Sequence, residues 1–472
     1  MTSLSAAGRT GPPEAPGRSL LRGRRERAVL PSAPVPLAFQ PDDKHPMVDA
    51  LLRPRVARWE SLNRAIDERD DMLEFAIQLF EHDRDRALTN YFQNGLDQFQ
   101  LVRHIASWRG PIERMLDFAS GYGRLTRFLV HERLASEVTV SDILEGGMDF
   151  QAAQFGVRTI LSTTRPQDFS APEKYDLIFV ASLFTHLPPA TFTPWLRRLA
   201  ELLTPAGLLI FTVHDQSISP HTFEGGISFE SRSESRVLDV DDYGSTWVTE
   251  SYVREQVAAI DRDWACVRMP RALAEWQDVY VISPSPIDNA SPRRVPKGFV
   301  DQFELTDAGV RLQGWATAVH EKAGRVEVRL DDEVVATTRD FAPRPDVAAW
   351  VGVETATDSG WELIVPHASI RSFRYQVTTV SAFTPTGEER ILFLGTMDSL
   401  NGHVAREKAR ALEQHAAVQA GELASLRHDL GVVDHQRAEL AAQLEAMRQS
   451  RFWKLRERWF AIKRAARMTD EL

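Results

Sequence analysis

The pattern of hydrophobic and polar positions changes three times along the 472-residue chain. Between 111 and 282, short apolar runs alternate with segments of helical spacing, which predicts the strands and helices of a mainly parallel α/β sheet. From 298 to 398, apolar and polar residues alternate with period two, as in short antiparallel strands. From 403 to 449, apolar residues recur in steps of four and three, which predicts one long helix. We therefore expect several domains.

The first 110 residues divide into two parts. Residues 1–45 are proline-rich, and the first forty hold six arginines and two glutamates without an apolar signal core. We expect a disordered basic arm or an over-extended start codon there, rather than a targeting peptide. Residues 46–110 are predicted to be helical, because apolar residues recur at helical spacing around Leu73 and again from Arg84 to Trp108. Gly95 is a candidate break in the second of these helices.

A glycine-rich turn lies within the stretch MLDFASGYGRLTRFLV, residues 115–130. Its apolar start predicts a buried strand, and the helical spacing after the turn predicts a helix. Ala119, Gly121 and Gly123 would let a ligand approach the backbone closely, beside the positive end of the helix dipole. Asp117 in the strand would repel a phosphate, so the turn is expected to receive a cationic ligand.

Two further acidic positions follow predicted strands. Asp142 ends the second strand, 25 residues after Asp117, where a carboxylate can accept hydrogen bonds from the two hydroxyls of a ribose. Asp168 and Phe169 follow the next short strand, and an acid with an aromatic ring there can bind and stack an adenine. These positions predict a nucleoside-like ligand.

Two histidines end the next pair of predicted strands. The apolar strand at 175–181 leads into F-T-H-L, which contains His186, and the segment L-L-T-P-A-G-L-L-I-F-T leads to His214. These motifs, in this order, resemble those of class I S-adenosylmethionine (SAM) methyltransferases, with Ala119 in place of the usual first glycine. The resemblance covers roughly 85–283 and ends in two strands that are expected to form an antiparallel hairpin.

The resemblance implies a Rossmann-like α/β domain at 111–282 with SAM as its cofactor, covered by the helices at 46–110. It places acceptor specificity in the polar insert at 215–250, whose serine- and acid-rich part at 228–242 suggests mobility. It implies that nine positions bind the cofactor: Asp117, Ala119, Gly121, Gly123, Asp142, Ile143, Asp168, Phe169 and Ala181.

Residues 283–297 have the composition of a linker, and 298–398 are expected to form a small all-β sandwich of six to eight strands. Its motifs have a distant likeness to accessory β-sandwiches of bacterial surface-glycan enzymes. Trp315 and Trp361 are of the residue type that stacks on sugar faces, but the preferred interpretation places them in the core.

The C-terminal segment is predicted to be a coiled coil at 403–449 followed by a basic amphipathic helix at 450–472. The heptad seam stops at Met447, and a displaced apolar stripe begins at Phe452. Seven basic residues against one acid within 451–468 favour an anionic membrane surface as the partner of Phe452–Met468. With S-R-F-W-K-L-R at 450–456, this tail resembles those of enzymes that build bacterial surface polysaccharides, including O-antigen. The alternatives are a long helix packed on its own chain and a capping helix.

Composition excludes several classes of protein. The formal net charge of −10 and a pI of about 5.8 argue against a dedicated nucleic-acid binder. The single cysteine, Cys266, excludes a disulfide scaffold and a cysteine-based zinc site, and it fits a reducing cytoplasm. No apolar run approaches the roughly 18 residues of a spanning helix. We expect a cytoplasmic protein, peripheral on the inner face of the plasma membrane through its tail.

The expected reaction is transfer of a methyl group from SAM to a hydroxyl of a surface glycan or its lipid-linked precursor. His214 or His186 is the candidate general base, and no metal is expected. One alternative is a methyltransferase of a small molecule or protein whose tail only forms a homo-oligomer. The other is a non-catalytic scaffold that retains the fold.

Overall fold

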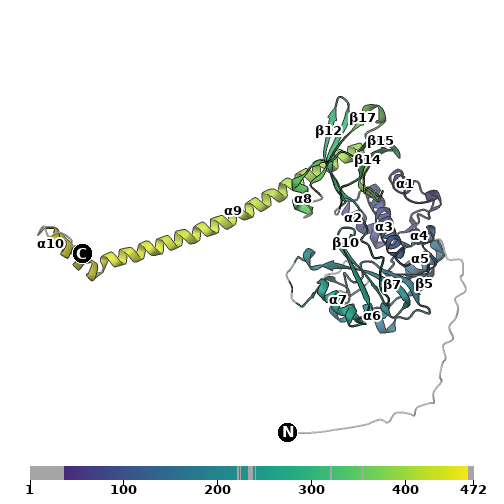
Figure 1. Ribbon diagram of the computed structural model, residues 1–472, viewed down its shortest axis with the longest axis horizontal. Helices are drawn as coiled ribbons and strands as arrows, with labels where there is room; N and C mark the ends of the chain where they lie inside the picture. The colour runs from purple at the N-terminus through teal and green to yellow at the C-terminus, as the bar shows by residue number, and fades with distance from the viewer. Residues whose placement is uncertain are drawn as a thin grey trace, which may run out of the picture.

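The computed structural model of the chain describes residues 37–220, 223, 225–231, 238, 239, 241–318, 321–351 and 356–465. The first 36 residues of the expected basic arm, part of the insert at 228–242, and residues 466–472 of the terminal helix lie outside the described residues. Figure 1 shows a globular part from which a single long helix projects.

A seven-stranded path forms the centre of the largest sheet. Its order is β10-β11-β7-β6-β3-β4-β5, with parallel pairing from β7 to β5 and antiparallel pairing of β11 with both neighbours. The strands are β3 (Ile112–Phe118), β4 (Ala135–Asp142), β5 (Arg158–Leu161), β6 (Tyr175–Val180), β7 (Leu203–Asp215), β10 (Ala265–Leu273) and β11 (Gln277–Ser283). The expected Rossmann-like sheet with a closing hairpin is confirmed.

Successive side chains of each central strand enter opposite cores. On β3, Met115 belongs to the cluster under the N-terminal helices, whereas Leu116 belongs to the cluster on the other face. This alternation follows from the period of two along a strand. The sheet is therefore buried on both faces, as the near-continuous apolar runs predict. The covering helices are α4 (Thr126–His131), α5 (Glu145–Phe155), α6 (Pro189–Ala200) and α7 (Glu250–Ala258).

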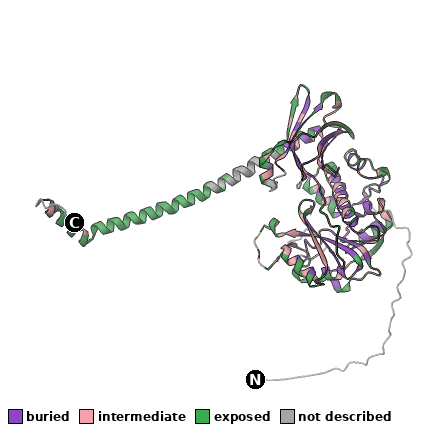
Figure 2. Cartoon of the chain, viewed as in Figure 1, coloured by how far each residue is buried: buried purple, intermediate pink, exposed green. Residues whose placement is uncertain are grey.

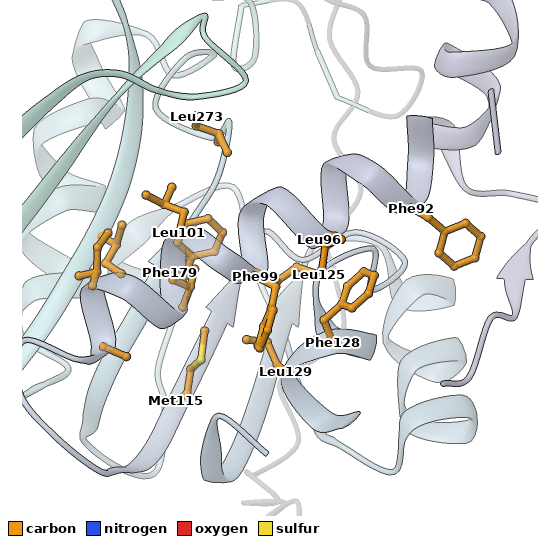
Figure 3. Close-up of a cluster of buried hydrophobic side chains, with 14 of the residues drawn as sticks. Phe92, Leu96, Phe99, Leu101, Met115, Leu125, Phe128, Leu129, Phe179 and Leu273 are labelled. Atoms are coloured by element: carbon orange, nitrogen blue, oxygen red, sulfur yellow. The ribbon is translucent and has the colours of Figure 1, made fainter. Parts of the chain in front are cut away.

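The N-terminal segment covers one of these faces (Figure 3). It consists of β1 (Leu37–Phe39), α1 (Pro46–Leu52), β2 (Ile66–Asp67), α2 (Asp71–Leu79) and α3 (Arg84–Ala106). The structure differs from two expectations. Residues 37–45 are not part of a disordered arm, because β1 pairs with β2 and His45 caps α1. Gly95 does not break α3; it lets the helix pass close to the carbonyl of Arg124, 2.4 Å from where a Cβ would lie.

The polar insert contributes two short strands to the same sheet. β8 (Ile227–Glu230) pairs antiparallel with β9 (Ser245–Val248), and β9 pairs in parallel with the end of β7. The register places Trp247 opposite His214. The described residues of the insert at both ends of 228–242 are thus fixed by the sheet beside the second histidine.

Eight strands form two four-stranded antiparallel sheets after the linker. One has the order β12-β13-β17-β16 and the other β15-β14-β18-β19. Their bounds are β12 (Lys297–Thr306), β13 (Gly309–Thr317), β14 (Arg325–Leu330), β15 (Glu333–Thr338), β16 (Ala342–Pro343), β17 (Asp358–Pro366), β18 (Val377–Phe383) and β19 (Glu389–Thr396). A short helix, α8 (Pro345–Val351), lies between β16 and β17. Trp361 is buried in the shared core, and Trp315 is half-buried.

Ion pairs join this β domain to the N-terminal segment. Arg55 donates to both carboxylate oxygens of Glu389, at 2.9 and 2.5 Å. Arg390 lies 3.9 Å from Asp97 of α3 and 2.5 Å from Glu275 in the β10–β11 turn. Burial raises the pKa of Asp97, and the neighbouring guanidinium groups oppose that shift.

The C-terminal helices begin in the β domain. α9 (Met397–Gln449) starts with Met397, Leu400 and Val404 buried in the β-domain core, and its residues 423–449 are exposed (Figures 1 and 2). α9 ends at Gln449, the backbone of Ser450 is extended, and α10 (Arg451–Ala465) follows. The interruption lies three residues after Met447, where the heptad seam stops. Among the described residues, no helix is both long and apolar enough to cross a bilayer.

Candidate active site

The turn after β3 has a strained backbone that leaves one side open. Ala119, Gly121 and Gly123 have φ values of 59°, 56° and 79°, in the left-handed region that side chains disfavour. A Cβ at Gly121 would meet no atom within 4 Å, whereas one at Gly123 would lie 2.6 Å from the ring of Phe155. Gly123 is therefore required by packing, and Gly121 presents bare backbone toward open space, as close approach of a ligand requires.

Asp142 ties this turn to the end of β4. Its Oδ2 accepts a hydrogen bond of 2.8 Å from the Gly121 N–H, and its Oδ1 accepts one of 3.0 Å from the Leu144 N–H. Burial raises the pKa of Asp142, and the backbone N–H groups, including that of Ile143, oppose this effect. Each carboxylate oxygen keeps a further lone pair, so the group can accept from hydroxyl donors while holding the turn.

Asp117 lies on β3, the strand that pairs with β4, and is 3% exposed. Its Oδ2 lies 3.0 Å from the hydroxyl oxygen of Thr126 at the start of α4. Burial raises the pKa of Asp117 to about 7; the contact with Thr126 lowers it, and the nearby charge of Asp142 adds to the rise. Two acids at the carboxyl edge of adjacent strands favour a cation and disfavour a phosphate. These two carboxylates therefore fit SAM, which carries a positive sulfonium charge and two ribose hydroxyls.

Three residues of this site escaped the sequence analysis. Gln151 on α5 is fully buried and donates from Nε2 to Ser120 Oγ at 2.8 Å and to the Gly121 carbonyl at 2.9 Å. Thr126 bridges Gln151 and Asp117. Gly147 lets α5 approach the turn, because a Cβ there would lie 2.5 Å from the Gly121 carbonyl. A polar residue on the apolar face of a predicted helix is the signal that would have drawn attention to Gln151.

The N-terminal segment reaches the same turn. Arg69, between β2 and α2, donates from Nε and Nη2 to the buried carboxylate of Asp67, at 2.9 and 2.8 Å. Its guanidinium lies 5.8 Å from the ring centroid of Tyr122 and close to Gly146 of α5. Arg69 therefore brings the N-terminal segment beside the turn after β3, and the covering of the cofactor by residues 46–110 stays a prediction.

The positions after β5 only partly match their expected roles. Asp168, in a turn of 3₁₀ helix at Pro166–Asp168, has a half-exposed side chain that pairs with Arg165. Phe169 is 1% exposed, and its ring makes edge contact with Phe118 at 5.1 Å between centroids. A ring buried in the core has no free face, so the expected stacking of Phe169 on an adenine is wrong. Ala181 follows β6 and packs against the hydrophobic core under the N-terminal helices.

The two candidate bases lie together at the ends of β6 and β7, with 6.4 Å between ring centroids. His186 Nδ1 lies 2.6 Å from the Gly244 carbonyl, and its ring stacks on Tyr243 with centroids 4.4 Å apart. A carbonyl only accepts, so Nδ1 carries a proton. The insert thus fixes the orientation of His186.

His214 is in a different state. Its pKa is lowered to about 4, mainly by burial and secondly by His186, while the backbone of Thr246 opposes the shift. The buried Nδ1 has no hydrogen-bond partner among the described residues, and the ring lies 6.2 Å from that of Trp247. His214 is therefore neutral at physiological pH and a weaker base than an ordinary histidine.

Two cavities lie away from this edge. One of about 380 Å³ is lined by Leu37, Asp70 and neighbouring residues of the N-terminal segment. The other, of about 690 Å³, lies at the opposite ends of β3 and β4, near Ile112 and Ala135. Neither of these two cavities is lined by the histidines or by Asp142. In the part of the chain that is described, no three potential metal ligands cluster.

Part of the chain is similar to known proteins. Residues 116–209 match a family model described as a methyltransferase domain. No curated protein matches the chain. Similar solved structures include a SAM-dependent methyltransferase from Clostridium acetobutylicum (12% identity, 46% of this chain and 98% of that one, TM-score 0.33). They also include 1,6-didemethyltoxoflavin-N1-methyltransferase from Burkholderia thailandensis (19%, 39% and 76%, 0.30) and the glycopeptide N-methyltransferase MtfA (14%, 40% and 90%, 0.31).

The matched residues contain the glycine-rich turn, both strand-end acids and His186. The chain carries a SAM-dependent methyltransferase domain.

Proposed function

We propose that this enzyme methylates a hydroxyl of a surface glycan or its lipid-linked precursor while bound to the cytoplasmic face of a membrane. The observation that carries the proposal is the contact between His186 Nδ1 and the Gly244 carbonyl, at 2.6 Å. It holds the ring of His186, a candidate base, in a fixed orientation at the carboxyl edge of the sheet, where the cofactor turn also lies. A neutral sugar hydroxyl needs such a base to become a good nucleophile.

His186 is favoured over His214 as this base. Both are neutral when they can act, but His214 has a pKa of about 4 and would give little driving force for proton removal. His186 is held by a hydrogen bond on one side and by the Tyr243 ring on the other. In this scheme the chain's residues orient the hydroxyl and accept its proton, and the bound SAM supplies an electrophilic methyl group for in-line transfer.

A glycan acceptor fits the aromatic side chains around the base. Tyr243 is half-buried and stacked on His186, whereas Trp247 is buried and packs beside His214. Aromatic faces pack on the C–H faces of sugar rings while their polar edges form hydrogen bonds. The described part of the insert would therefore contribute the acceptor specificity.

Membrane attachment is proposed for α10. Phe452, Leu455, Trp459 and Ile462 are 79%, 72%, 60% and 63% exposed, so the apolar stripe is not covered by any of the described residues. Six basic residues and one acid lie within the described 451–465. Each basic residue near an anionic surface contributes on the order of 1 kcal/mol. A helix of this length would lie in the interface with its tryptophans at headgroup depth.

A homo-oligomer is proposed for α9. The seam residues Leu426, Leu430, Leu440 and Leu444 are each more than half exposed along a helix that projects from the globular part (Figure 2). Pairing with second copies would bury this seam as in a coiled coil. Two or more copies of α10 on one assembly would bind a membrane with avidity.

The experiment that tests the reaction is methyl transfer from isotopically labelled SAM to lipid-linked and free oligosaccharides, with the product examined by NMR. We expect an O-methyl group. His186→Ala should lower kcat by about 10²–10⁴-fold at unchanged affinity for SAM, whereas His214→Gln should have a smaller effect. A methyl group on nitrogen, or His186→Ala activity equal to wild type at every pH, would contradict the proposal.

A further inference from the structure

A buried hydrogen-bond chain connects the strand acid to the helix α5. Asp117, Thr126 and Gln151 are 3%, 0% and 0% exposed. The Thr126 hydroxyl oxygen lies 3.0 Å from Asp117 Oδ2 and 2.7 Å from Gln151 Oε1. Both distances are those of hydrogen bonds, so the donor of each hydrogen bond has to be identified.

The orientation of the Gln151 amide is fixed by its other contacts. One amide atom lies 2.9 Å from the Gly121 carbonyl, which can only accept, so that atom is the nitrogen. The same nitrogen lies 2.8 Å from Ser120 Oγ. The remaining atom, Oε1, is an acceptor and faces Thr126.

This assignment uses the single proton of Thr126. A hydroxyl has one O–H, and the shorter contact requires it to point to Gln151 Oε1. Asp117 Oδ2 then faces a lone pair of the Thr126 oxygen. An ionised carboxylate would be repelled there, whereas a protonated carboxyl group donates a hydrogen bond across the same 3.0 Å.

The surrounding charges act in the same direction. The charged group that acts on Asp117 is Asp142 on β4, which disfavours a second negative charge. The guanidinium of Arg127, on the same helix as Thr126, is directed instead to the Ala65 carbonyl and the Tyr91 hydroxyl. That of Arg124 interacts electrostatically with Tyr91 and Asp70. Burial, together with the charge of Asp142, raises the pKa of Asp117 to about 7, and only a hydrogen bond from Thr126 would lower it.

We propose that Gln151 and Thr126 hold Asp117 protonated in the free protein and that binding of the cationic cofactor releases this proton to solvent. Thr126 can then turn its O–H toward the new carboxylate, so that the charge is both paired and hydrogen-bonded. Gln151 is a positioning residue in this account, because it acts on Asp117 through Thr126. The inference deepens the cofactor site of the proposed function and depends on SAM binding there.

The test is calorimetric titration of SAM into the full chain in buffers of different ionisation enthalpy. The buffer dependence of the heat gives the number of protons released per ligand. We expect close to one proton at about pH 6 and almost none at about pH 9, with affinity rising up to about tenfold per pH unit below the pKa. Asp117→Asn, whose amide can donate to Thr126 in the same way, should bind without proton release at any pH.

A second measurement reports the free protein directly. The carboxyl carbon of Asp117, assigned in ¹³C NMR spectra by comparison with Asp117→Asn, should titrate near pH 7. Gln151→Leu frees the Thr126 proton for Asp117 and should move that titration to lower pH. Gln154→Leu, one turn along α5 and bonded to Asn63, is the matched control and should leave it in place.

The outcomes separate the two claims. SAM that binds without proton release, or an Asp117 signal that titrates near pH 4 in the wild type, would overturn the protonated state while leaving the cofactor site intact. No SAM binding, with the Asp117 signal still titrating near pH 7, would refute the cofactor-linked release and the proposed function but preserve the hydrogen-bond assignment.

Discussion

The backbone N–H of Gly121 donates a hydrogen bond of 2.8 Å to Oδ2 of Asp142, and this contact joins the turn after β3 to the end of β4. The two loops are 21 residues apart in sequence, yet they form one cofactor edge. The acid therefore has two roles: it fixes the backbone that the ligand approaches, and it retains lone pairs for the ligand's hydroxyls. Removing the carboxylate of Asp142 should disturb both the turn and the binding of the ligand's hydroxyls.

Gly95 offers a stability test of how the N-terminal segment packs. A Cβ at this position would lie 2.4 Å from the Arg124 carbonyl and 2.8 Å from the Phe128 ring. Gly95→Ala should therefore lower the free energy of unfolding by about 1–3 kcal/mol, measured by chemical denaturation, despite the better helix propensity of alanine. Gly421→Ala in α9, where a Cβ meets nothing within 4 Å, is the control and should not destabilise the protein. A stabilising Gly95→Ala would mean that α3 does not pack closely here.

His214 should make stability fall as the pH falls. Its folded pKa of about 4 lies below the unfolded value of about 6.5, so the unfolded chain binds a proton that native His214 does not. The contribution is complete above about pH 6.5 and is lost toward pH 4, by on the order of 3 kcal/mol. Asp117 contributes with the opposite sign, but it is common to wild type and variant and cancels in their difference.

The comparison is therefore wild type with His214→Gln, which cannot take up the proton in either state. Chemical denaturation between about pH 4 and about pH 7 should show a shallower loss of stability for the variant. His435→Gln, with a side chain 78% exposed on α9, should follow the wild type. Parallel curves for wild type and His214→Gln would show that His214 titrates normally.

The seam of α9 predicts the oligomeric state. Wild type should have a light-scattering mass that is a multiple of 53.3 kDa. Leu426→Asp/Leu440→Asp should reduce it to the monomer, because charges in the seam oppose helix pairing. Val432→Asp is the matched control, since Val432 is 44% exposed but lies off the seam. A wild-type mass of one chain would refute the coiled coil, and an oligomer that survives the seam variant would place the interface elsewhere.

The stripe of α10 predicts flotation with anionic vesicles. Full-length protein should float with phosphatidylglycerol vesicles and much less with neutral phosphatidylcholine. Phe452→Glu/Trp459→Glu should abolish flotation, and a chain that ends after Gln449 should behave in the same way. Val432→Glu changes an exposed apolar residue outside α10 and should have no effect. Failure of the full-length protein to float would exclude α10 as a membrane anchor.

The central sheet was predictable because its signal is local. Apolar runs such as those of β3 and β6 are bounded by turns, and the acids that end β3 and β4 are adjacent to small or polar residues. The carboxyl ends of parallel strands meet at one edge, so Asp117, Gly121 and Asp142 could be grouped without coordinates.

Other features depend on contacts that sequence spacing does not encode. The expected roles of Phe169 and Gly95 came from their residue types alone. The ring of Phe169 is enclosed by Phe118 and Trp195. A glycine is needed at position 95 because α3 passes close to Arg124. The role of Gln151 arises from three partners on two other elements. The ranking of His186 over His214 required the burial of one ring and the hydrogen bond of the other.

The most direct test of the account is SAM binding to Gly121→Trp. Gly121 faces open space at the turn, so a large side chain there should occupy the position of the cofactor. Gly156→Trp is the matched control, because Gly156 also has positive φ and open space but caps the far end of α5. Titration calorimetry should show SAM binding to the wild type and to Gly156→Trp, and none to Gly121→Trp. Equal SAM affinity for all three proteins would contradict the placement of the cofactor at this turn.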